Sequence, residues 1–261
     1  METKWPRISI VTPSLNQGNF IETTIQSVLS QKYPNLEYLI IDGGSTDDTL
    51  SILNSFNRQV KWISEKDNGQ TDAINKGLRL VTGEIVAYLN ADDVLLPGSL
   101  VDVAKIFMEH PEVQWLTGRC KIIDDNGVAV RGVISLYKNL LLYSSSFRIL
   151  LVTNYISQPA TFWCTEVLNL CGLFDSKFNY VMDYDYWLRI WKKVDAPYIY
   201  HQDLAGFRIQ RNSKTTSSGH LQDYVDEERL VVERYSPSKI WNQLHNFHRI
   251  LMTNIYRFIN R

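Results

Sequence analysis

The chain has 261 residues, 44% of them hydrophobic, with 27 lysines and arginines against 28 acidic residues. This length and composition predict one large hydrophobic core. The net charge of −1 argues against a nucleic-acid partner, because proteins that bind nucleic acids normally carry a clear basic excess.

Cysteine usage and the length of apolar runs indicate the compartment. Cys120, Cys164 and Cys171 are scattered without a Cys-x-x-Cys pair, which argues against a zinc site or a disulfide framework. No apolar run reaches the length of a membrane span, and residues 1–10 lack the apolar stretch of a signal peptide. We therefore expect a cytoplasmic protein.

The first part of the chain alternates strand patterns with helical spacing. Strands are expected at residues 8–11, 36–41, 60–63 and 84–89, and helices at 21–29, 50–56 and 72–80. Such alternation predicts an α/β fold with a Rossmann-like, mostly parallel sheet covered by helices on both faces.

Polar clusters follow the four expected strands, at residues 12–16, 42–45, 65–70 and 90–93. In open α/β sheets, ligands bind outside the carboxyl ends of the strands. The four clusters should therefore meet in one crevice.

The second part predicts a smaller, mixed arrangement that continues the same domain. Strands are expected at 113–116, 121–123 and 158–162, with two more within 198–209; helical segments are expected at 136–152, 166–170 and 184–194. Asp125-Asn126-Gly127 predicts a hairpin turn, and Gly172 should end the helix at 166–170.

The segment 236–261 differs in composition, with four basic residues and no acidic one. Its apolar residues recur at helical spacing. A basic amphipathic helix of this kind either lies on an anionic membrane surface or packs its apolar face on the domain, and the pattern leaves both open.

Asp92 and Asp93 stand directly after an apolar strand. Neighbouring carboxylates at such a position are costly unless a positive group meets them. Mg²⁺ and Mn²⁺ prefer oxygen ligands and often share one or two carboxylates with substrate phosphates. The alternative is that one of the two acids caps the turn that follows.

Asp42 ends the second strand and could accept hydrogen bonds from a ribose or a base, or form an Asx-turn into Gly43. No Gly-x-Gly-x-x-Gly follows the first strand, which disfavours a dinucleotide-binding enzyme. The segment 43–46 also lacks the lysine of a phosphate-binding loop.

Asp183 and Asp185 flank Tyr184 at the expected start of a helix. The helix dipole favours acids in a first turn, which is the simplest explanation for both. If this helix start faces the crevice, a carboxylate there could instead take the proton from an attacking hydroxyl.

Taken together, these residues resemble family 2 glycosyltransferases, over about residues 7–210. The segments that carry the resemblance are Thr12-Pro13-Ser14-Leu15-Asn16-Gln17, Ser27-Val28-Leu29-Ser30-Gln31-x-Tyr33-Pro34, Ile41-Asp42-Gly43-Gly44-Ser45-Thr46-Asp47, Asp72-Ala73-Ile74-Asn75-Lys76-Gly77, Leu89-Asn90-Ala91-Asp92-Asp93 and the Asp183 segment. Any one motif is weak evidence, whereas the ordered set is specific. It looks most like the branch that builds bacterial O-antigen and capsular polysaccharide.

The resemblance implies a GT-A fold over residues 1–235, with a nucleotide-sugar half at 1–118, an acceptor half at 119–235 and the amphipathic helix at 236–261. The implied nucleotide-sugar residues are Thr12, Pro13, Ser14, Asn16, Asp42, Lys66, Asp67, Gln70, Asp72, Asn90, Ala91 and Asp92. Asp92 would also bind Mn²⁺ or Mg²⁺, and Asp183 would be the catalytic base. Gln158, Tyr184 and Asp185 would line the pocket of the acceptor or the donor sugar.

Two positions depart from the family pattern. Asn90 replaces the first acid of the Asp-x-Asp motif, and it keeps an acceptor oxygen. Gln210 stands where many relatives carry a histidine that meets the metal or the diphosphate. The metal is therefore expected to be held loosely, or only together with the donor.

The implied activity is inverting transfer of a sugar from a nucleotide-diphosphate sugar, with a UDP-sugar expected, to the hydroxyl of a glycan or lipid-linked glycan. The protein would act in the cytoplasm, with peripheral contact to the cytoplasmic face of a membrane through its last helix. The rival hypotheses are a nucleotidyltransferase, a non-catalytic saccharide-binding or scaffold protein on the same fold, and a processive polymerase. Segment 13–17 lacks the glycine-rich loop of the first, and the expected absence of membrane spans disfavours the last.

Overall fold

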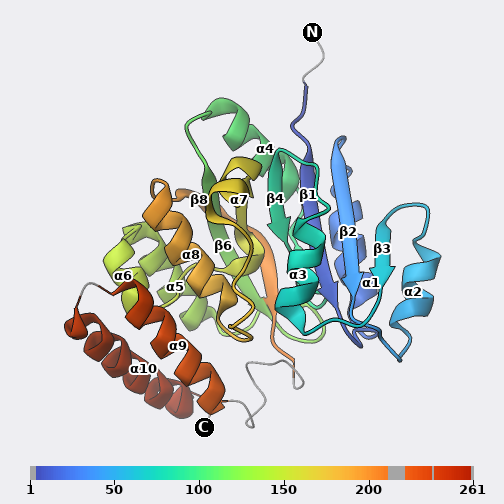
Figure 1. Cartoon of the computed structure of the whole chain (residues 1–261). Coiled ribbons are helices and arrows are strands. Elements are labelled where there is room, and N and C mark those ends of the chain that lie inside the picture. The colour runs from blue at the N-terminus through green and yellow to red at the C-terminus, as the bar shows by residue number, and fades with distance from the viewer. Residues whose placement is uncertain (1–3, 211–220, 237, 260–261) are drawn as a thin grey trace.

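A computed structural model describes residues 4–210, 221–236 and 238–259, and its central feature is an eight-stranded mixed sheet of order β3-β2-β1-β4-β7-β6-β8-β5 (Figure 1). The strands are β1 (Ile8–Ser14), β2 (Leu36–Asp42), β3 (Lys61–Ser64), β4 (Ile85–Tyr88), β5 (Val94–Leu95), β6 (Trp115–Ile123), β7 (Thr161–Cys164) and β8 (Tyr198–Arg208). The expected α/β class with a mostly parallel first half is confirmed.

The first four strands along the chain form a continuous parallel block. β1 pairs in parallel with β2 and β4, so that Ile8 lies opposite both Leu36 and Ile85, and β3 extends the block beyond β2. Every residue of β1 is buried. Ile10 belongs to the apolar cluster on one face of the sheet and Val11 to the cluster on the other, as expected for side chains that alternate along a strand covered on both faces.

Helices cover both faces of this sheet. They are α1 (Ile21–Leu29), α2 (Thr49–Ser55), α3 (Gln70–Leu78), α4 (Ser99–Glu109), α5 (Gly132–Ser144), α6 (Phe147–Val152), the 3₁₀ turn η1 (Gln158–Ala160), α7 (Thr165–Cys171), α8 (Met182–Lys193), α9 (Leu221–Tyr235) and α10 (Lys239–Ile259). The core cluster on one face contains residues of α1 and α4, and the cluster on the other contains residues of α3, α7 and α8. The sheet therefore lies between two layers of helices.

The second half of the sheet differs from the expectation in detail. β7 runs antiparallel to β4 and β6, whereas β8 runs parallel to β6 and antiparallel to β5. The two strands expected at 113–116 and 121–123 are one strand, β6, and the two expected within 198–209 are one strand, β8. Pairing continues through a register shift next to Gly118, where a Cβ atom would lie 2.6 Å from Leu204 Cδ1. A glycine bulge thus replaces the expected strand break.

The chain closes with two helices that pack side by side (Figure 1). α9 was not predicted from the sequence, whereas α10 forms the helix expected within 236–261. His245 of α10 is buried, and its Nδ1 lies 2.9 Å from the Val152 carbonyl oxygen of α6. In the described part of the chain, no helix combines the length and apolar character needed to cross a membrane.

The expected division of the domain at residue 118 falls inside β6. The same sheet therefore runs through both proposed halves, and the division stays a prediction.

Candidate functional site

A cavity of about 610 Å³ opens at the carboxyl ends of β1 and β4. Its walls come from parts of the chain that are far apart: the segment after β1, the start of α3, the segment after β4, the inner side of α5, the turn before η1, the start of α8 and the end of β8. This is the crevice expected from the polar strand ends, at the edge where α/β sheets bind ligands.

Asp92 lines the cavity, whereas Asp93 is fully buried behind it. One Asp93 carboxylate oxygen accepts the backbone N–H of Arg208 at 2.9 Å, and the other lies 3.1 Å from Asn90 Nδ2. Burial raises the pKa of Asp93 well above its usual range, and the neighbouring Asp92 raises it further. Asp93 therefore fixes this turn onto β8 and leaves Asp92 as the acid that faces the cavity.

Gln210, where many relatives have a histidine, contacts Asp92 in the structure. Its Nε2 donates to Asp92 Oδ2 at 2.7 Å. Burial raises the pKa of Asp92, and this hydrogen bond opposes the rise. The side chain at position 210 therefore reaches the acid that was predicted to bind the metal.

A chain of amide side chains crosses the cavity floor next to Asp92. Gln70 Nε2 donates to Asn90 Oδ1 at 2.7 Å, and Asn90 Nδ2 donates to Gln158 Oε1 at 3.3 Å. Gln158 in turn donates to the Tyr88 carbonyl oxygen at the end of β4, at 2.6 Å. Three of the predicted site residues are thus joined across α3, the end of β4 and η1.

Asp183 lies in the first turn of α8 and also lines the cavity. Burial raises the pKa of its carboxyl to about 6, while the Tyr184 backbone N–H at 2.7 Å and the nearby Lys138 ammonium oppose the rise. Asn154 Nδ2 lies 3.5 Å from the second oxygen. A carboxylate with this proton affinity is ionised at neutral pH and can still accept a proton.

The segment leading into Asp183 is held by Glu227 of α9. Its carboxylate accepts backbone N–H groups from Asn179 at 2.9 Å, Tyr180 at 2.8 Å and Val181 at 3.3 Å. These three residues also line the cavity. One side chain from a distant helix thereby fixes the backbone that carries the candidate base.

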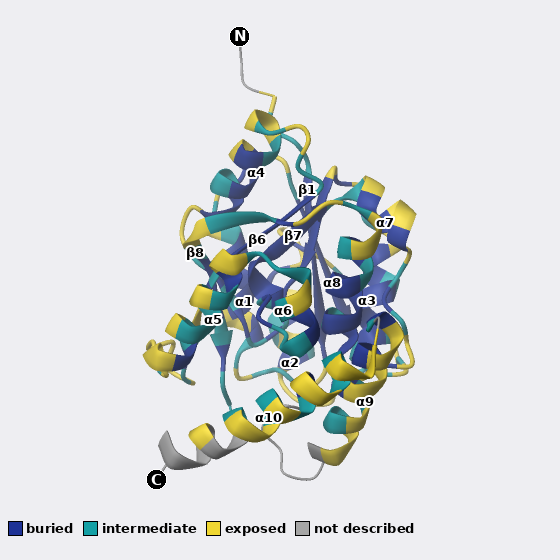
Figure 2. Cartoon of the chain, turned by 90° about the vertical axis from the view of Figure 1, so that its left-hand side faces the viewer, coloured by how far each residue is buried: buried dark blue, intermediate teal, exposed yellow. Residues whose placement is uncertain are grey.

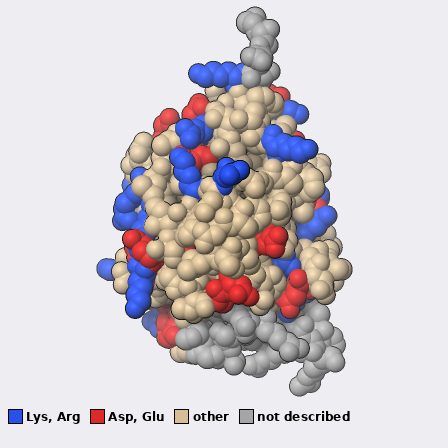
Figure 3. Space-filling view, turned by 90° about the vertical axis from the view of Figure 1, so that its right-hand side faces the viewer, with Lys and Arg blue, Asp and Glu red and all other residues tan. Residues whose placement is uncertain are grey.

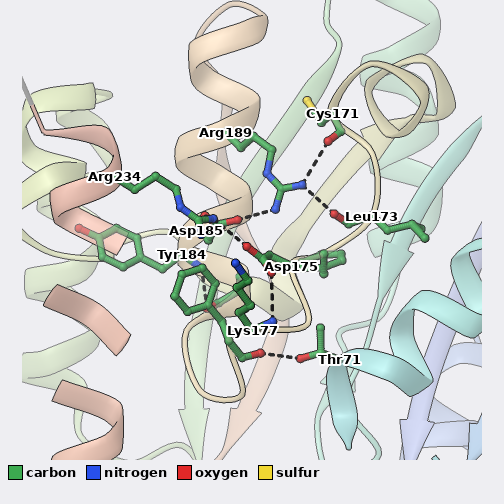
Figure 4. Close-up of polar contacts among 12 residues, drawn as sticks. Thr71, Cys171, Leu173, Asp175, Lys177, Tyr184, Asp185, Arg189 and Arg234 are labelled. Atoms are coloured by element: carbon green, nitrogen blue, oxygen red, sulfur yellow. Dashed lines mark hydrogen bonds and ion pairs between the residues drawn. The ribbon is translucent and has the colours of Figure 1, made fainter. Parts of the chain in front are cut away.

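Tyr184 and Asp185 do not line the cavity, in contrast to the expected pocket role. Tyr184 is buried and donates to the Leu150 carbonyl oxygen at 2.6 Å. Asp185 is fully buried between helices, where it pairs with Arg189 and with Arg234 at 2.7 Å (Figure 4). Because successive residues of a helix point in different directions, Asp183 faces the cavity whereas Tyr184 and Asp185 do not.

Arg234 also reaches Asp175 at 2.9 Å (Figure 4). The Tyr235 hydroxyl donates to Asp185 at 3.0 Å. A buried carboxylate without such partners would be strongly destabilising. The contacts of Asp185 therefore join α8 to α9. They give this second acid of the motif a structural role instead of a role in ligand binding.

Among the residues predicted to hold the nucleoside, several support the loops behind the cavity instead of lining it. Asp42 is fully buried and accepts the backbone N–H groups of Gly44 at 3.1 Å and Ser45 at 2.9 Å, which is the Asx-turn alternative. The Thr12 hydroxyl lies 3.1 Å from the Tyr38 hydroxyl. Asn16 adopts φ 51° and accepts the Thr46 backbone N–H at 2.9 Å, which ties the loops after β1 and β2 together.

The remaining predicted residues divide between the cavity wall and the surface. Pro13, Ser14, Asp67, Gln70 and Ala91 line the cavity. Lys66 and Asp72 do not.

Asp72 accepts the Asn68 backbone N–H at 3.0 Å and lies 3.7 Å from the Lys76 ammonium. Lys66 is exposed. A Cβ atom at Gly43 would lie 2.5 Å from Asp67 Oδ2, so a larger residue there would displace the Asp67 side chain.

Two cationic residues of the cavity were missed in the sequence. Lys138 of α5 lines the wall, where burial lowers the pKa of its amine and the nearby Asp183 carboxylate opposes that shift. Arg208 is almost fully buried at the end of β8 and donates to the Asp92 carbonyl oxygen at 2.8 Å. The available signal was a single charged residue inside an otherwise apolar segment in each case.

The residues present fit a divalent cation that binds together with a phosphate ligand. Within the described residues, no group of three or more His, Cys, Asp and Glu side chains gathers into a complete metal cage. Asp92, however, offers a desolvated carboxylate to a cavity with many polar walls. Mg²⁺ and Mn²⁺ need only one or two protein carboxylates when phosphates and water supply the other ligands.

Comparison with known proteins decides the family. The model of glycosyl transferase family 2 matches residues 9–158. The chain belongs to glycosyl transferase family 2. It is therefore a glycosyltransferase, as predicted from the ordered motifs.

Two curated glycosyltransferases resemble the chain, one over most of its length and the other over about half of it. An uncharacterised glycosyltransferase of Rickettsia prowazekii is 27% identical over 227 residues, which cover 85% of this chain and 70% of the relative. TuaG of Bacillus subtilis, named for teichuronic acid biosynthesis, is 34% identical over 128 residues, covering 47% of this chain and 51% of TuaG.

Solved structures confirm the GT-A fold. The mannosyltransferase PcManGT of Pyrobaculum calidifontis, in complex with GDP-Man and Mn²⁺, matches with a TM-score of 0.72 at 18% identity, over 94% of this chain and 70% of that one. A fragment of S. aureus TarS in complex with UDP-GlcNAc matches with a TM-score of 0.66 at 18% identity, over 92% of this chain and 70% of that one. The chain spans 41% of a longer TarS structure.

Proposed function

We propose that this family 2 enzyme transfers a sugar from a nucleotide-diphosphate sugar to an acceptor hydroxyl with inversion of the anomeric configuration. The observation that carries the proposal is that Asp92 and Asp183, 91 positions apart in the chain, line one cavity. A cavity of about 610 Å³ is of the size that holds ligands as large as a nucleotide sugar.

The donor is assigned to the part of the cavity at the ends of β1 and β4. Ser14, Asp67 and Gln70 lie there with Asp92. Asp92, with the Gln210 amide beside it, would hold Mn²⁺ or Mg²⁺ against the donor's diphosphate, where the cation supplies positive charge to the leaving group.

Asp183 is assigned the proton transfer. It takes the proton from the acceptor hydroxyl as the oxygen attacks the anomeric carbon, and the bond to the diphosphate breaks on the opposite side. A single displacement of this kind inverts the anomeric centre and needs no covalent enzyme intermediate. Lys138, on the same side of the cavity, lowers the cost of keeping Asp183 ionised.

The substrate class is proposed from the relatives. PcManGT is described with GDP-Man and TarS with UDP-GlcNAc. We infer a UDP-sugar as the donor and a glycan or lipid-linked glycan as the acceptor, in the synthesis of a bacterial surface polysaccharide such as O-antigen or capsule. TuaG, by its name, belongs to a related kind of process. The site of action is the cytoplasm, at the cytoplasmic face of the membrane.

The decisive experiment pairs a donor screen with a base variant. Nucleotide sugars are tested with Mn²⁺ by thermal shift, because a tight ligand raises the unfolding temperature. The hit is then assayed for turnover with Asp183→Asn. Turnover should fall by about 10²–10⁴-fold, the usual contribution of a general base, while donor binding persists.

Asp125→Asn is the matched control and should leave turnover unchanged, because Asp125 is exposed in a turn and does not line the cavity. Near-normal turnover of Asp183→Asn would remove this residue from the base role. A product with retained anomeric configuration, seen by NMR, would contradict the single displacement.

A further inference from the structure

α10 carries a row of large apolar side chains that no described residue covers. Ile240, Leu244, Phe247, Leu251 and Ile255 recur every three or four residues, and they are between 39% and 67% exposed. The opposite side of the helix packs on the protein through the buried His245. Since residues three and four apart share one helix face, the row is continuous along α10.

α5 carries a second row of the same kind. Val133, Leu136, Leu140 and Tyr143 are between 43% and 70% exposed. The other side of this helix contributes Ile134 and Lys138 to the cavity wall. α5 therefore separates the cavity from an exposed apolar surface.

The two helices meet. The Tyr137 hydroxyl of α5 lies 2.6 Å from His248 Nε2 of α10, and the two rings stack. Tyr137 directly follows Leu136 of its row, and His248 directly follows Phe247 of the other. The contact brings the two helices together next to both rows, which are here termed the α5–α10 surface, and Figure 2 shows both helices on the same side of the molecule.

The segments that carry the α5–α10 surface contain basic but no acidic residues, whereas the neighbouring helix α9 carries exposed acids such as Asp226 and Glu233. Residues 126–165 and 236–261 contain no aspartate or glutamate. Arg131, Arg148 and Lys239 are exposed within these segments. The side of the molecule over α2 and β3, by contrast, carries charges of both signs (Figure 3).

We propose that the α5–α10 surface docks on the anionic surface of a lipid bilayer, with α5 and α10 lying in the interface. Exposed apolar patches of this extent on soluble proteins usually mark interaction sites. Amphipathic helices with basic flanks bind anionic membranes by burying their apolar face, and each lysine or arginine near the surface adds attraction. A second copy of the chain is a poorer partner, because it would bring together two pairs of helices whose own charged residues are all basic.

The position of α5 gives this surface a consequence for the acceptor, which rests on the proposed function. One side of the helix meets the lipid while the other lines the cavity that contains Asp183. A lipid-linked acceptor could therefore present its sugar to the base while its lipid stays in the bilayer. Two helices also fix the orientation of the enzyme, which a single amphipathic helix would not.

The test measures co-sedimentation with vesicles of equal parts phosphatidylglycerol and phosphatidylcholine, and with vesicles of phosphatidylcholine alone. The full chain should bind the anionic vesicles, and added salt should weaken binding. Leu140→Glu on α5 and Phe247→Glu on α10 should each lower the partition coefficient by about tenfold or more, as expected when one large apolar side chain stays in water. Leu80→Glu is the control, because Leu80 follows α3 and is 46% exposed.

Folding of each variant is checked by its unfolding temperature and by the thermal shift that UDP with Mn²⁺ produces. Loss of vesicle binding through Phe247→Glu alone would reduce the surface to α10 and overturn the two-helix proposal. The whole proposal would be overturned if the unmodified chain did not bind the vesicles. It would also be overturned if the chain formed a dimer that both variants dissociate. If vesicles bind but no nucleotide sugar is turned over, the proposed function fails while this surface stands.

Discussion

Burial gives Asp183 a proton affinity that suits a base. Desolvation raises the pKa of its carboxyl to about 6, and Lys138 limits the rise because its positive charge favours the ionised form. As the proposed base, Asp183 can accept a proton only when its carboxyl is ionised. Activity should therefore appear as the pH rises through the pKa of this group.

We expect turnover to fall about tenfold per pH unit below about 6, from the protonation of Asp183. In Lys138→Met the acidic limb of the profile should move to higher pH, because the charge that favours the carboxylate is gone. The measurement is turnover at saturating donor from pH 4.5 to 8, with stability checked at each pH. An acidic limb at the same pH in both proteins would separate Lys138 from Asp183.

Asp92 makes a different prediction, for binding instead of turnover. Asp92→Ala should weaken donor binding by about 10–100-fold in Mn²⁺, the loss typical of a disturbed metal site. Calorimetry with and without EDTA tests it: chelation should weaken donor binding to the unmodified protein and change little in the variant. Equal sensitivity of both proteins to EDTA would place the metal elsewhere.

Asp92 and Asp183 could be picked out from the sequence, because each follows an apolar segment at a predicted strand end or helix start. The pattern could not show which of two neighbouring acids faces the cavity. Asp93 and Asp185 share the same motifs, and both are buried in structural networks. Their direction depends on partners such as Arg208 and Arg234, which lie 115 and 49 residues further along the chain.

At the scale of elements, α9 holds the start of α8 in place through two of its side chains. Glu227 accepts hydrogen bonds from the backbone of residues 179–181. Further along the same helix, Arg234 forms ion pairs with Asp185 and Asp175. The two attachments fix the segment before Asp183 from both ends. α9 therefore shapes the cavity although only Tyr224 of this helix lines it among the described residues.

Glu227→Ala should lower turnover by about 10–100-fold, because small displacements of a reacting group cost about that much. Glu227→Gln keeps an acceptor oxygen and should recover part of the loss. Glu233→Ala is the matched control on α9, since its exposed ion pair with Arg229 contributes little. Donor affinity should stay unchanged in all three, as measured by calorimetry. An equal loss in Glu233→Ala would indicate general weakening of α9 instead of a displaced base.

The elements of the first half were predictable because their apolar residues keep a clean strand or helix period and turn residues separate them. The second half was less so. Gly118 and Arg119 interrupt the apolar pattern of β6, and only the partner strand shows that pairing continues through the bulge. β5 has two residues and exists because Gly206 and Ala205 pair with it, which no local pattern reveals.

For the whole molecule, the sequence indicated the α/β class, the cavity at the strand ends and the apolar last helix. It did not indicate where α9 would pack, or that α5 would contact α10. Both depend on contacts between segments more than 40 residues apart, such as Asn179 with Glu227 and Tyr137 with His248. The periodicity of apolar residues predicts each helix by itself and does not predict which other helix it packs against.

The pairing of β8 with both β6 and β5 constrains how this protein can be recombined with its relatives. Val94 lies opposite Gly206, and the Asp93 carboxylate accepts the Arg208 backbone N–H, so the turn that presents Asp92 is completed by residues more than a hundred positions later. A chimera that exchanges the proposed acceptor half at residue 118 would bring a foreign strand into this contact. Exchanges that aim to alter acceptor choice should therefore keep β8 from the same parent as the Asp92 turn and replace only the residues between β6 and β8.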